Sequence, residues 1–263
     1  NLIQSDLKLN RNQQIAFENI EKSFEERDIC LLHGVTGSGK TEIYIKLIEK
    51  YLEENKQILY LLPEIALTTQ LVTRLTKHFG NKVVVYHSKY SNNERVEVWN
   101  NVLKSSANAQ IIIGARSALF LPFNNLGLII VDEEHEATFK QYDPSPRYHA
   151  RDAGIVLANY HKSKVLLGSA TPSIETYYNA SSGKYSLVSL QERYGNSILP
   201  EIQLVDLKDS YFRKKMKGHF SISLIEAISE AFSRGEQVIL FQNRRGFSPV
   251  LECAYATVVR MIF

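Results

Sequence analysis

A glycine-rich stretch that ends in a lysine and a threonine has the most sharply defined chemistry in this sequence. Residues 34–41 read Gly-Val-Thr-Gly-Ser-Gly-Lys-Thr, and the apolar run 29–32 precedes them. A buried strand that leads through a glycine turn into a helix lets backbone N–H groups surround phosphate oxygens. The residues expected to bind the nucleotide here are Gly34, Val35, Thr36, Gly37, Ser38, Gly39, Lys40 and Thr41. With the Lys40 ammonium facing the β- and γ-phosphates and the Thr41 hydroxyl on Mg²⁺, the pattern predicts nucleoside triphosphate binding.

A second group of polar residues follows another apolar run. Residues 128–131 are Leu-Ile-Ile-Val, and Asp132, Glu133, Glu134 and His135 come directly after them. Carboxylates at the C-terminal end of a buried parallel strand lie at the edge where such sheets bind ligands. Asp132 is expected to hold the metal through water, and Glu133 to polarise the attacking water. Glu134 fits two interpretations equally well, a solvated position at the start of a helix and a functional role. We interpret His135 as a conformational relay rather than a capping residue.

Regular elements are needed to position these residues, and short β-branched runs alternate with helical periodicity up to residue 185. The predicted strands are 29–33, 58–62, 83–86, 111–114, 128–131 and 165–168. The predicted helices are 40–54, 66–78, 93–103 and 149–161. Strands buried on both faces and separated by crossover helices indicate an α/β fold with a mainly parallel sheet and helices on both faces.

The pattern weakens after residue 185. Gly195, Asn196 and Pro200 mark a connector at 191–200. A second α/β pattern then comprises strand 202–205, helix 221–232 and strand 237–241. Two strands and one helix cannot bury both faces of a sheet. We therefore expect a first domain at 1–190 and an incomplete second domain at 201–263.

Composition limits the class of protein. The chain has 263 residues, of which 44% are hydrophobic and 22% charged, as in soluble globular proteins. An export signal and an apolar run of about 20 residues are absent, which predicts a cytoplasmic protein. Cys30 and Cys253 indicate a reducing compartment and offer no complete zinc site. The net charge of +3 does not identify a nucleic-acid partner, and the basic stretch 208–219 suits a solvated loop or a phosphate track equally well.

Further blocks follow one another in an order that resembles a known family. They are Leu-Asn-Arg-Asn-Gln at 9–13, Pro-Glu-Ile-Ala-Leu-Thr-Thr-Gln at 63–70, Gly-Ala-Arg-Ser-Ala-Leu-Phe at 114–120, Asp-Glu-Glu-His at 132–135, Gly-Ser-Ala-Thr-Pro-Ser at 168–173 and Asn-Arg-Arg-Gly-Phe at 243–247. This succession resembles superfamily 2 DNA helicases. With Arg-Tyr-His-Ala-Arg-Asp at 147–152, it most resembles the replication restart helicases of the PriA family, also called primosomal protein N′. The resemblance extends to about residue 253.

The resemblance implies a RecA-like P-loop NTPase lobe and an incomplete second RecA-like lobe. It implies the core of an ATP-dependent 3′-to-5′ DNA helicase that restarts stalled replication forks through primosome assembly. ATP hydrolysis would be coupled to translocation on single-stranded DNA, with ATP and Mg²⁺ as cofactors. The implied partners are single-stranded and forked DNA and, by resemblance, single-strand-binding protein and primosome proteins. The implied location is cytoplasmic and nucleoid-associated.

The resemblance also gives roles to individual residues. Gln13 would read the adenine base, Lys40, Asp132 and Glu133 would be catalytic, and His135, Ser169 and Thr171 would couple the nucleotide state to DNA grip. The implied DNA-binding residues are Thr68, Gln70, Arg116, Phe139, Lys140, Tyr142, Arg147 and Tyr148. Aromatic rings interleaved with cations form a stacking platform worth about 1–3 kcal/mol per base. An ordinary amphipathic loop, helix capping and hydroxyl caps before a proline remain alternatives for these residues.

The sequence departs from the family near its end. In the family the 243–247 block leads into a zinc module, but here Cys253 is followed by no other cysteine, and a structural zinc needs about four ligands. The later helicase motifs, including an arginine finger, and the N-terminal DNA-binding domain are also missing. We therefore expect a truncated chain, and the alternative function is an ATP- and DNA-binding module with little or no turnover. A P-loop kinase or transporter ATPase fits 34–41 but not 114–120 or 168–173.

Overall fold

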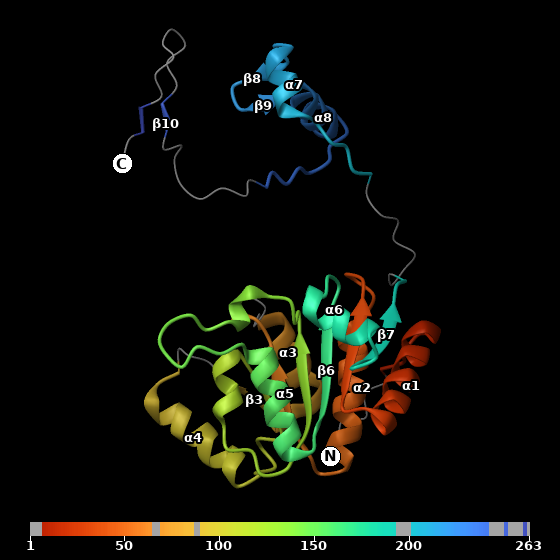
Figure 1. The fold of residues 1–263 in the computed structure, drawn as a ribbon, viewed down its shortest axis with the longest axis vertical. Helices are drawn as coiled ribbons and strands as arrows, with labels where there is room; N and C mark the ends of the chain where they lie inside the picture. Colours follow the sequence, from red (N-terminus) through yellow and green to blue (C-terminus); the bar gives the residue numbers. More distant parts are fainter. Residues whose placement is uncertain are drawn as a thin grey trace. The chain divides into compact units, whose positions relative to one another are not determined.

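Parallel strands form the central sheet of the first of two units. The computed structural model describes residues 7–64, 69–86, 90–192, 201–241, 250–251 and 260–261. The chain divides into the units Asn1–Ile198 and Leu199–Phe263. In the described part of the first unit, the strands are β1 (Ile29–Gly34), β2 (Gln57–Leu61), β3 (Val83–Tyr86), β4 (Ile111–Gly114), β5 (Leu126–Asp132), β6 (Lys164–Ser169) and β7 (Ser186–Leu190). Their order is β3-β4-β2-β5-β6-β1-β7, and every neighbouring pair is parallel (Figure 1).

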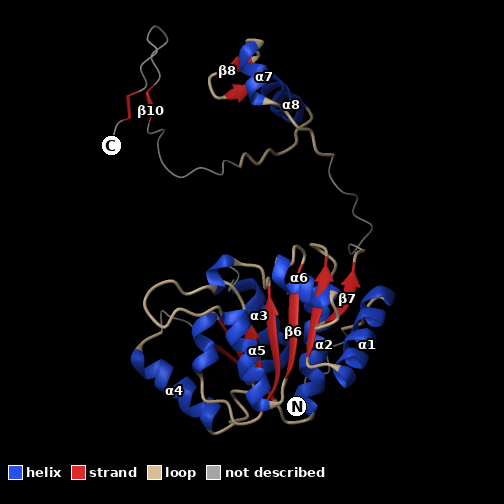
Figure 2. Cartoon of the chain, viewed as in Figure 1, coloured by secondary structure: helices blue, strands red, loops and turns tan. Residues whose placement is uncertain are grey.

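Helices cover both faces of this sheet (Figure 2). One face packs against α1 (Arg11–Glu26), α2 (Lys40–Glu53) and α3 (Thr69–Phe79). The other face packs against α4 (Asn92–Leu103), α5 (Ala150–His161) and α6 (Ile174–Ser181). Short 3₁₀ turns occur at η2 (Gly80–Lys82), η3 (Arg116–Phe120) and η4 (Ala137–Phe139). This is the expected α/β fold, a RecA-like lobe with a parallel sheet between two helical layers.

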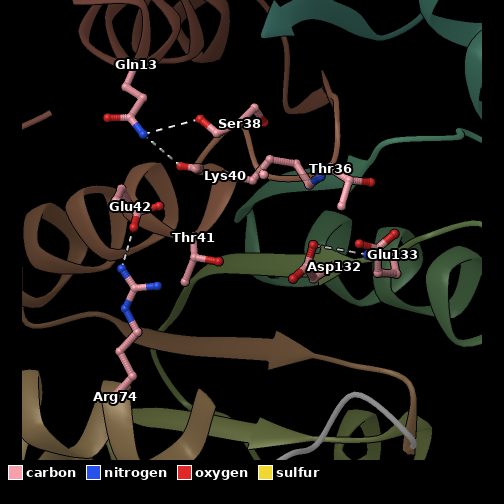
Figure 3. Close-up of a pocket in the computed structure, with 11 residues that line it drawn as sticks. Gln13, Thr36, Ser38, Lys40, Thr41, Glu42, Arg74, Asp132 and Glu133 are labelled. Carbon is pink, nitrogen blue, oxygen red and sulfur yellow. Dashed lines mark hydrogen bonds and ion pairs between the residues drawn. The ribbon is translucent and has the colours of Figure 1, made fainter. Parts of the chain in front are cut away.

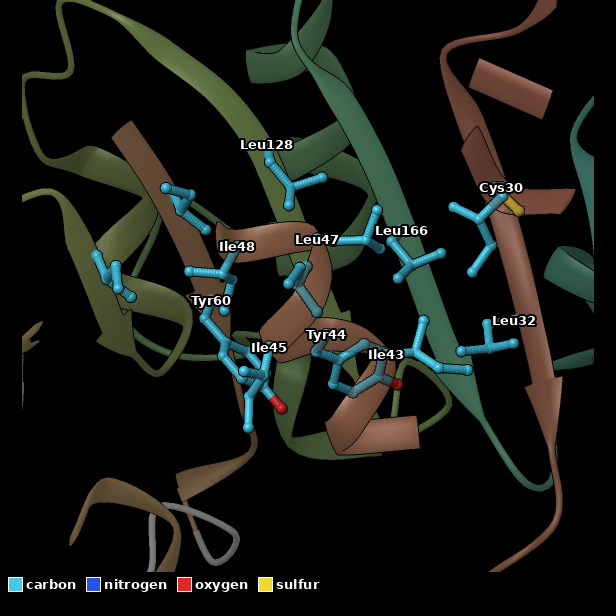
Figure 4. Close-up of a cluster of buried hydrophobic side chains, with 14 of the residues drawn as sticks. Cys30, Leu32, Ile43, Tyr44, Ile45, Leu47, Ile48, Tyr60, Leu128 and Leu166 are labelled. Carbon is cyan, nitrogen blue, oxygen red and sulfur yellow. The ribbon is translucent and has the colours of Figure 1, made fainter. Parts of the chain in front are cut away.

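The core on the first face holds the helix that follows the glycine loop. Leu47 and Ile48 of α2 are fully buried and belong to one cluster with Leu128 of β5 and Leu166 of β6 (Figure 4). Alternate residues of the same strands, such as Ile129 and the residues beside it in neighbouring strands, point into the second cluster. Because the strands are buried on both faces, the C-terminal ends of β1, β5 and β6 are held at fixed relative positions.

Strand register brings three sequence motifs to one edge of the sheet. Asp132 at the end of β5 lies beside Gly168 of β6, and Ser169 lies beside His33 of β1. The glycine loop begins at Gly34, the residue after His33. The 34–41, 132–135 and 168–173 segments therefore leave the sheet next to one another at its carboxyl edge.

Two α-helices and one strand of the first unit were not predicted from the sequence, namely α1, α6 and β7, and neither were the short 3₁₀ turns. The six predicted strands and four predicted helices of this unit are present, apart from the start of the helix predicted at 66–78. Residues 65–68 of that helix lie outside the described residues. Strand β7 alternates buried and exposed residues and contains Ser186 and Ser189, so it lacks the continuous apolar run of an inner strand.

In the second unit one prediction is confirmed and two are wrong. The helix expected at 221–232 is α8 (Ile222–Ser233). The segments 202–205 and 237–241 are not strands, and Leu204 and Ile239 are more than 90% exposed. A short apolar run becomes a strand only where a neighbouring strand pairs with it, and no strand in the described part of this unit pairs with either segment. Its other elements are α7 (Leu207–Phe212), β8 (Met216–Lys217), β9 (Phe220–Ser221), β10 (Val250–Leu251) and β11 (Arg260–Met261).

Within the ranges that the structure describes, no helix combines the length and the apolar character needed to cross a bilayer.

Candidate nucleotide-binding site

A pocket of about 400 Å³ opens at the carboxyl edge of the sheet. It is lined by Gln13, Thr36, Gly37, Ser38, Gly39, Lys40, Thr41, Glu42, Arg74, Asp132 and Glu133 (Figure 3). The ammonium of Lys40 and the carboxylates of Asp132 and Glu133 thus share one pocket, although they are far apart in the sequence. The two segments with the clearest chemistry in the sequence form a single site.

The glycines of the loop present backbone to this pocket. Gly37 and Gly39 have φ values of +77° and +84°, in the left-handed region that favours glycine. A Cβ on Gly39 would lie 2.0 Å from the Nε2 atom of Gln13, so a larger residue there would have to displace the Gln13 side chain as well as adopt a strained φ. Gly39 is also the N-cap of α2 and makes no side-chain capping bond, which leaves the first N–H groups of the helix for an anion.

The side chains of the loop suit a phosphate chain as well. The Lys40 Nζ atom donates to the carbonyl of Gly34 at 2.8 Å, which holds the ammonium against the loop. The Ser38 hydroxyl is buried and has no hydrogen-bond partner among the described residues. Buried polar groups normally find partners, so this hydroxyl is an exception among the described residues. The Thr41 hydroxyl and the Asp132 carboxylate supply the oxygen ligands that Mg²⁺ prefers.

Two buried tyrosines hold the Asp132 carboxylate, and sequence reasoning missed both. The Tyr44 hydroxyl donates to Oδ1 at 3.0 Å, and the Tyr60 hydroxyl donates to Oδ2 at 3.2 Å. Both tyrosines are fully buried. Burial and the neighbouring Glu133 raise the pKa of Asp132, while Tyr44, Lys40 and Tyr60 act in the opposite direction. The sequence did contain a signal for both residues. Tyr60 stands in the apolar run 58–62, and Tyr44 lies about one helical turn after Thr41. Because a buried tyrosine hydroxyl needs a hydrogen-bond partner, each position predicts a polar group nearby.

Backbone geometry separates the two glutamates that follow Asp132. Glu133 has φ of +51°, a left-handed conformation that costs energy in a residue other than glycine. Its side chain stays 38% exposed and lines the pocket, whereas Glu134 is fully buried. The solvated position considered for Glu134 is therefore wrong. The turn directs one carboxylate to the site and the next into the protein interior.

His135 connects this turn with the segment after β6. Its Nδ1 atom lies 2.8 Å from the Ser169 hydroxyl, and its Nε2 atom lies 3.4 Å from the Thr171 hydroxyl. The same ring lies 3.7 Å from the carboxylate of Glu133. The structure thus brings together the three residues expected to couple nucleotide state to DNA grip.

Gln13 lies on the pocket wall at the start of α1. Its Nε2 atom donates to the carbonyl of Ser38 at 3.3 Å, and its Oε1 atom accepts from the backbone of Asn10 at 2.9 Å. The second contact completes a capping box with Asn10. Gln13 therefore links the helix start to the glycine loop, and its contact with adenine stays a prediction.

Comparison with known proteins agrees with this geometry. Residues 10–180 match the family model of the DEAD/DEAH box helicases. This chain belongs to the DEAD/DEAH box helicase family. It is 44% identical over 249 residues to the replication restart protein PriA of Bacillus subtilis, covering 94% of this chain and 30% of that protein. It is 45% identical over 249 residues to PriA of Haemophilus influenzae, covering 94% of this chain and 33% of that protein.

Solved structures show the same helicase fold. The structure of RecG bound to a three-way DNA junction matches with a TM-score of 0.54 at 22% identity, covering 73% of this chain and 25% of that one. The helicase MrfA bound to DNA matches with a TM-score of 0.51 at 20% identity, covering 70% of this chain and 27% of that one. The chain spans about a third of the length of the curated relatives it matches.

The segment 137–149, here called the aromatic loop, holds most of the expected DNA contacts of this helicase lobe. Tyr142 is 69% exposed, and Arg147 is also exposed. Tyr148 packs edge to face against Phe120, with ring centroids 5.1 Å apart. Phe120 is 56% exposed and was not predicted as part of this surface. These side chains make an aromatic and cationic surface of the kind that stacks on bases.

Three other residues that were expected to bind DNA hold the aromatic loop in place. Phe139 is only 1% exposed and belongs to the core, so in this structure its ring has no free face for a base. The guanidinium of Arg116 donates to the carbonyls of Thr138 and Lys140 at 3.2 and 3.1 Å. Lys140 forms a β-bridge with His149 at the base of the loop.

The remaining two DNA predictions concern the segment before α3. Gln70 is exposed in the first turn of α3, and Thr68 lies outside the described residues. Their contact with DNA stays a prediction.

A further pocket residue, Arg74, escaped the sequence analysis. It extends from α3 toward Glu42 and pairs with that carboxylate on the wall of the site (Figure 3). Arg74 lies outside the family blocks recognised in the sequence. Its position in the same pocket as Thr41 therefore became visible only in the fold.

Proposed function

We propose that this chain carries the first motor lobe of an ATP-dependent DNA helicase of the replication restart type. The observation that carries the proposal is the convergence of Lys40, Thr41, Asp132 and Glu133 on one pocket. The similarity to PriA proteins supports the replication restart class. The alternative, a binding module with little or no turnover, rests on the missing second-lobe motifs, and neither the pocket nor the similarity to PriA proteins favours it.

Each residue has a definite task in hydrolysis. The N–H groups at the start of α2 bind the phosphate chain, and Lys40 neutralises its charge. Thr41 and Asp132 would hold Mg²⁺, which supplies positive charge to the phosphate oxygens when it is bound. Glu133 polarises the attacking water, since its carboxylate is exposed to the pocket. Tyr44 and Tyr60 fix the orientation of the Asp132 carboxylate.

Magnesium is the metal that the pocket residues fit. Among the residues that the structure describes, no three His, Cys, Asp or Glu side chains form a cluster that could hold a metal ion. Mg²⁺ commonly binds through one or two protein oxygens, waters and nucleotide phosphates, so it needs no such cluster. Zinc binding is proposed for the full-length family only, because Cys253 is followed by no other cysteine and a structural zinc needs about four ligands.

We place single-stranded DNA on the aromatic loop and propose that ATP hydrolysis moves the protein along that strand in the 3′-to-5′ direction. RecG and MrfA, which share the fold, were solved bound to DNA. Forked DNA, single-strand-binding protein and primosome proteins are the further proposed partners, and the nucleoid is the proposed location. The domain bounds 1–190 and 201–263 are part of the same proposal, in which the second unit begins a second RecA-like lobe.

Nucleotide binding is the direct test. A fluorescent, non-hydrolysable ATP analogue with Mg²⁺ should bind the wild-type chain, and Lys40→Ala should weaken this binding at least tenfold. Lys46→Ala is the matched control, because Lys46 lies on the same helix but pairs with Glu49 at 2.8 Å, away from the pocket. An analogue that binds wild type and K40A equally well would exclude the proposed site. A separate assay with ATP in place of the analogue, with and without single-stranded DNA, then tests whether turnover is stimulated.

A further inference from the structure

A buried ion pair lies between the turn after β5 and the start of α5, and the nucleotide pocket does not include it. The Arg151 Nη1 atom lies 2.9 Å from the Glu134 Oε2 atom. Glu134 is fully buried, and Arg151 is 9% exposed. Burial lowers the pKa of Arg151, but its bonds to Asp152 and Glu134 outweigh this effect and raise it overall, so the guanidinium is charged.

The two residues of this ion pair also form hydrogen bonds to the segment that follows β6. The backbone N–H of Ser173 donates to Glu134 Oε1 at 2.7 Å, and Arg151 Nη1 donates to the Ser173 hydroxyl at 2.6 Å. The Thr176 hydroxyl donates to Glu134 Oε2 at 2.8 Å. Ser173 is the N-cap of α6 and lies two residues after Thr171, which contacts His135. The ion pair therefore fixes the far end of the same short segment.

The residues that flank the aromatic loop are thus attached to residues 169–173. Two residues before the loop, His135 is bonded to Ser169. At its end, Arg151 stands in the first turn of α5, directly after the loop, and reaches Ser173. Glu134 is the residue after Glu133, which lines the pocket, so these hydrogen bonds are connected to the pocket through the backbone. Because these bonds fix the residues that flank the loop, a movement of the loop that reaches His135 or Arg151 must move the 169–173 segment or break the bonds.

A buried ion pair is costly to form and is weak evidence for stability, while its best-attested use is to fix one arrangement among alternatives. We propose that Glu134 and Arg151 are positioning residues that couple occupancy of the aromatic loop by single-stranded DNA to nucleotide affinity. They act through the 169–173 segment and touch neither ligand. The inference rests on the proposed function, because it requires that both ATP and DNA bind.

The test measures the coupling factor, the ratio of nucleotide dissociation constants without and with saturating oligothymidylate. A fluorescent, non-hydrolysable ATP analogue with Mg²⁺ is the probe, and the full 263-residue chain is the protein. In wild type we expect a factor of about fivefold or more. Glu134→Gln and Arg151→Lys should each bring the factor below about twofold while nucleotide affinity without DNA changes by less than about twofold. Their double variant should lose no more coupling than either single variant.

Val102→Ala is the matched control, because Val102 is fully buried at the C-terminal end of α4 and takes no part in the network. It should lower thermal stability and keep the coupling factor of wild type. Variants E134Q and R151K that couple like wild type would overturn the inference, as would a wild-type protein that binds both ligands without coupling. Failure of wild type to bind the analogue at all would instead refute the proposed function. If both variants lose folded signal in circular dichroism, Ser173→Ala, which removes the shared hydroxyl, must still reduce coupling or the inference falls.

Discussion

The nucleotide pocket and the aromatic loop are built in opposite ways. In the pocket, functional side chains are held by buried partners, as Tyr44 and Tyr60 hold Asp132. In the loop, side chains proposed to bind DNA, such as Tyr142, project into solvent, and the guanidinium of Arg116 supports the loop through hydrogen bonds to its backbone carbonyls. The pocket is pre-organised for a ligand of fixed shape, whereas the loop suits a flexible strand.

The difference separates residues that support a surface from residues that form it. Phe139 and Tyr142 are three positions apart in the same loop, yet one is 1% exposed and the other 69%. Aromatic side chains buried in a core contribute to stability, while exposed ones are available to partners. Substitution of each should therefore change a different measured quantity.

The largest expected effect is on stability at Phe139. Phe139→Ala should lower the free energy of unfolding by about 3–5 kcal/mol, because it leaves a cavity in the second core cluster. Tyr142→Ala should leave unfolding nearly unchanged and weaken binding of oligothymidylate by about 1–3 kcal/mol through loss of base stacking. Denaturant unfolding and fluorescence anisotropy measure the two effects. If Tyr142→Ala destabilises as much as Phe139→Ala, the distinction between support and surface is wrong.

The same distinction explains what could be predicted from the sequence. Six strands, five inner ones and the edge strand β3, were predicted because β-branched runs such as 111–113 are strongly driven to burial. Lys40, Thr41 and Asp132 were predicted because phosphate and metal chemistry restricts residue type and spacing. The sequence did not predict the roles of Tyr44 and Tyr60 or the ion pair between Glu134 and Arg151. Their partners come from elements that are distant in the sequence and that only the strand order brings together.

A second contrast lies between two glycines, and its expected effect is intermediate. A Cβ on Gly168 would stand 1.8 Å from the Tyr44 hydroxyl, whereas a Cβ on Gly154 of α5 would meet only ordinary contacts at 3.6 Å or more. Gly168→Ala should destabilise the fold by about 1–3 kcal/mol through overpacking and should weaken Mg²⁺-dependent nucleotide binding. Gly154→Ala should be neutral or stabilise by up to about 1 kcal/mol, since alanine favours helices.

Denaturant unfolding of the two glycine variants gives the comparison directly. Equal stability changes for both variants would mean that the approach of Tyr44 to β6 does not restrict residue 168. Loss of nucleotide binding in G168A with unchanged unfolding would place the effect in the pocket alone.

The smallest effect concerns the tyrosine hydroxyls themselves. Tyr44→Phe removes one donor from Asp132 and keeps the ring in the core, so the fold should persist. Because a hydrogen bond to a carboxylate contributes about 1.5 kcal/mol or more, the Mg²⁺ concentration for half-maximal nucleotide binding should rise about tenfold. Tyr51→Phe is the control, since Tyr51 lies two turns further along α2 and does not line the pocket. A Y44F protein with the Mg²⁺ requirement of wild type would show that Tyr60 and the backbone N–H of Glu133 are sufficient to orient the carboxylate.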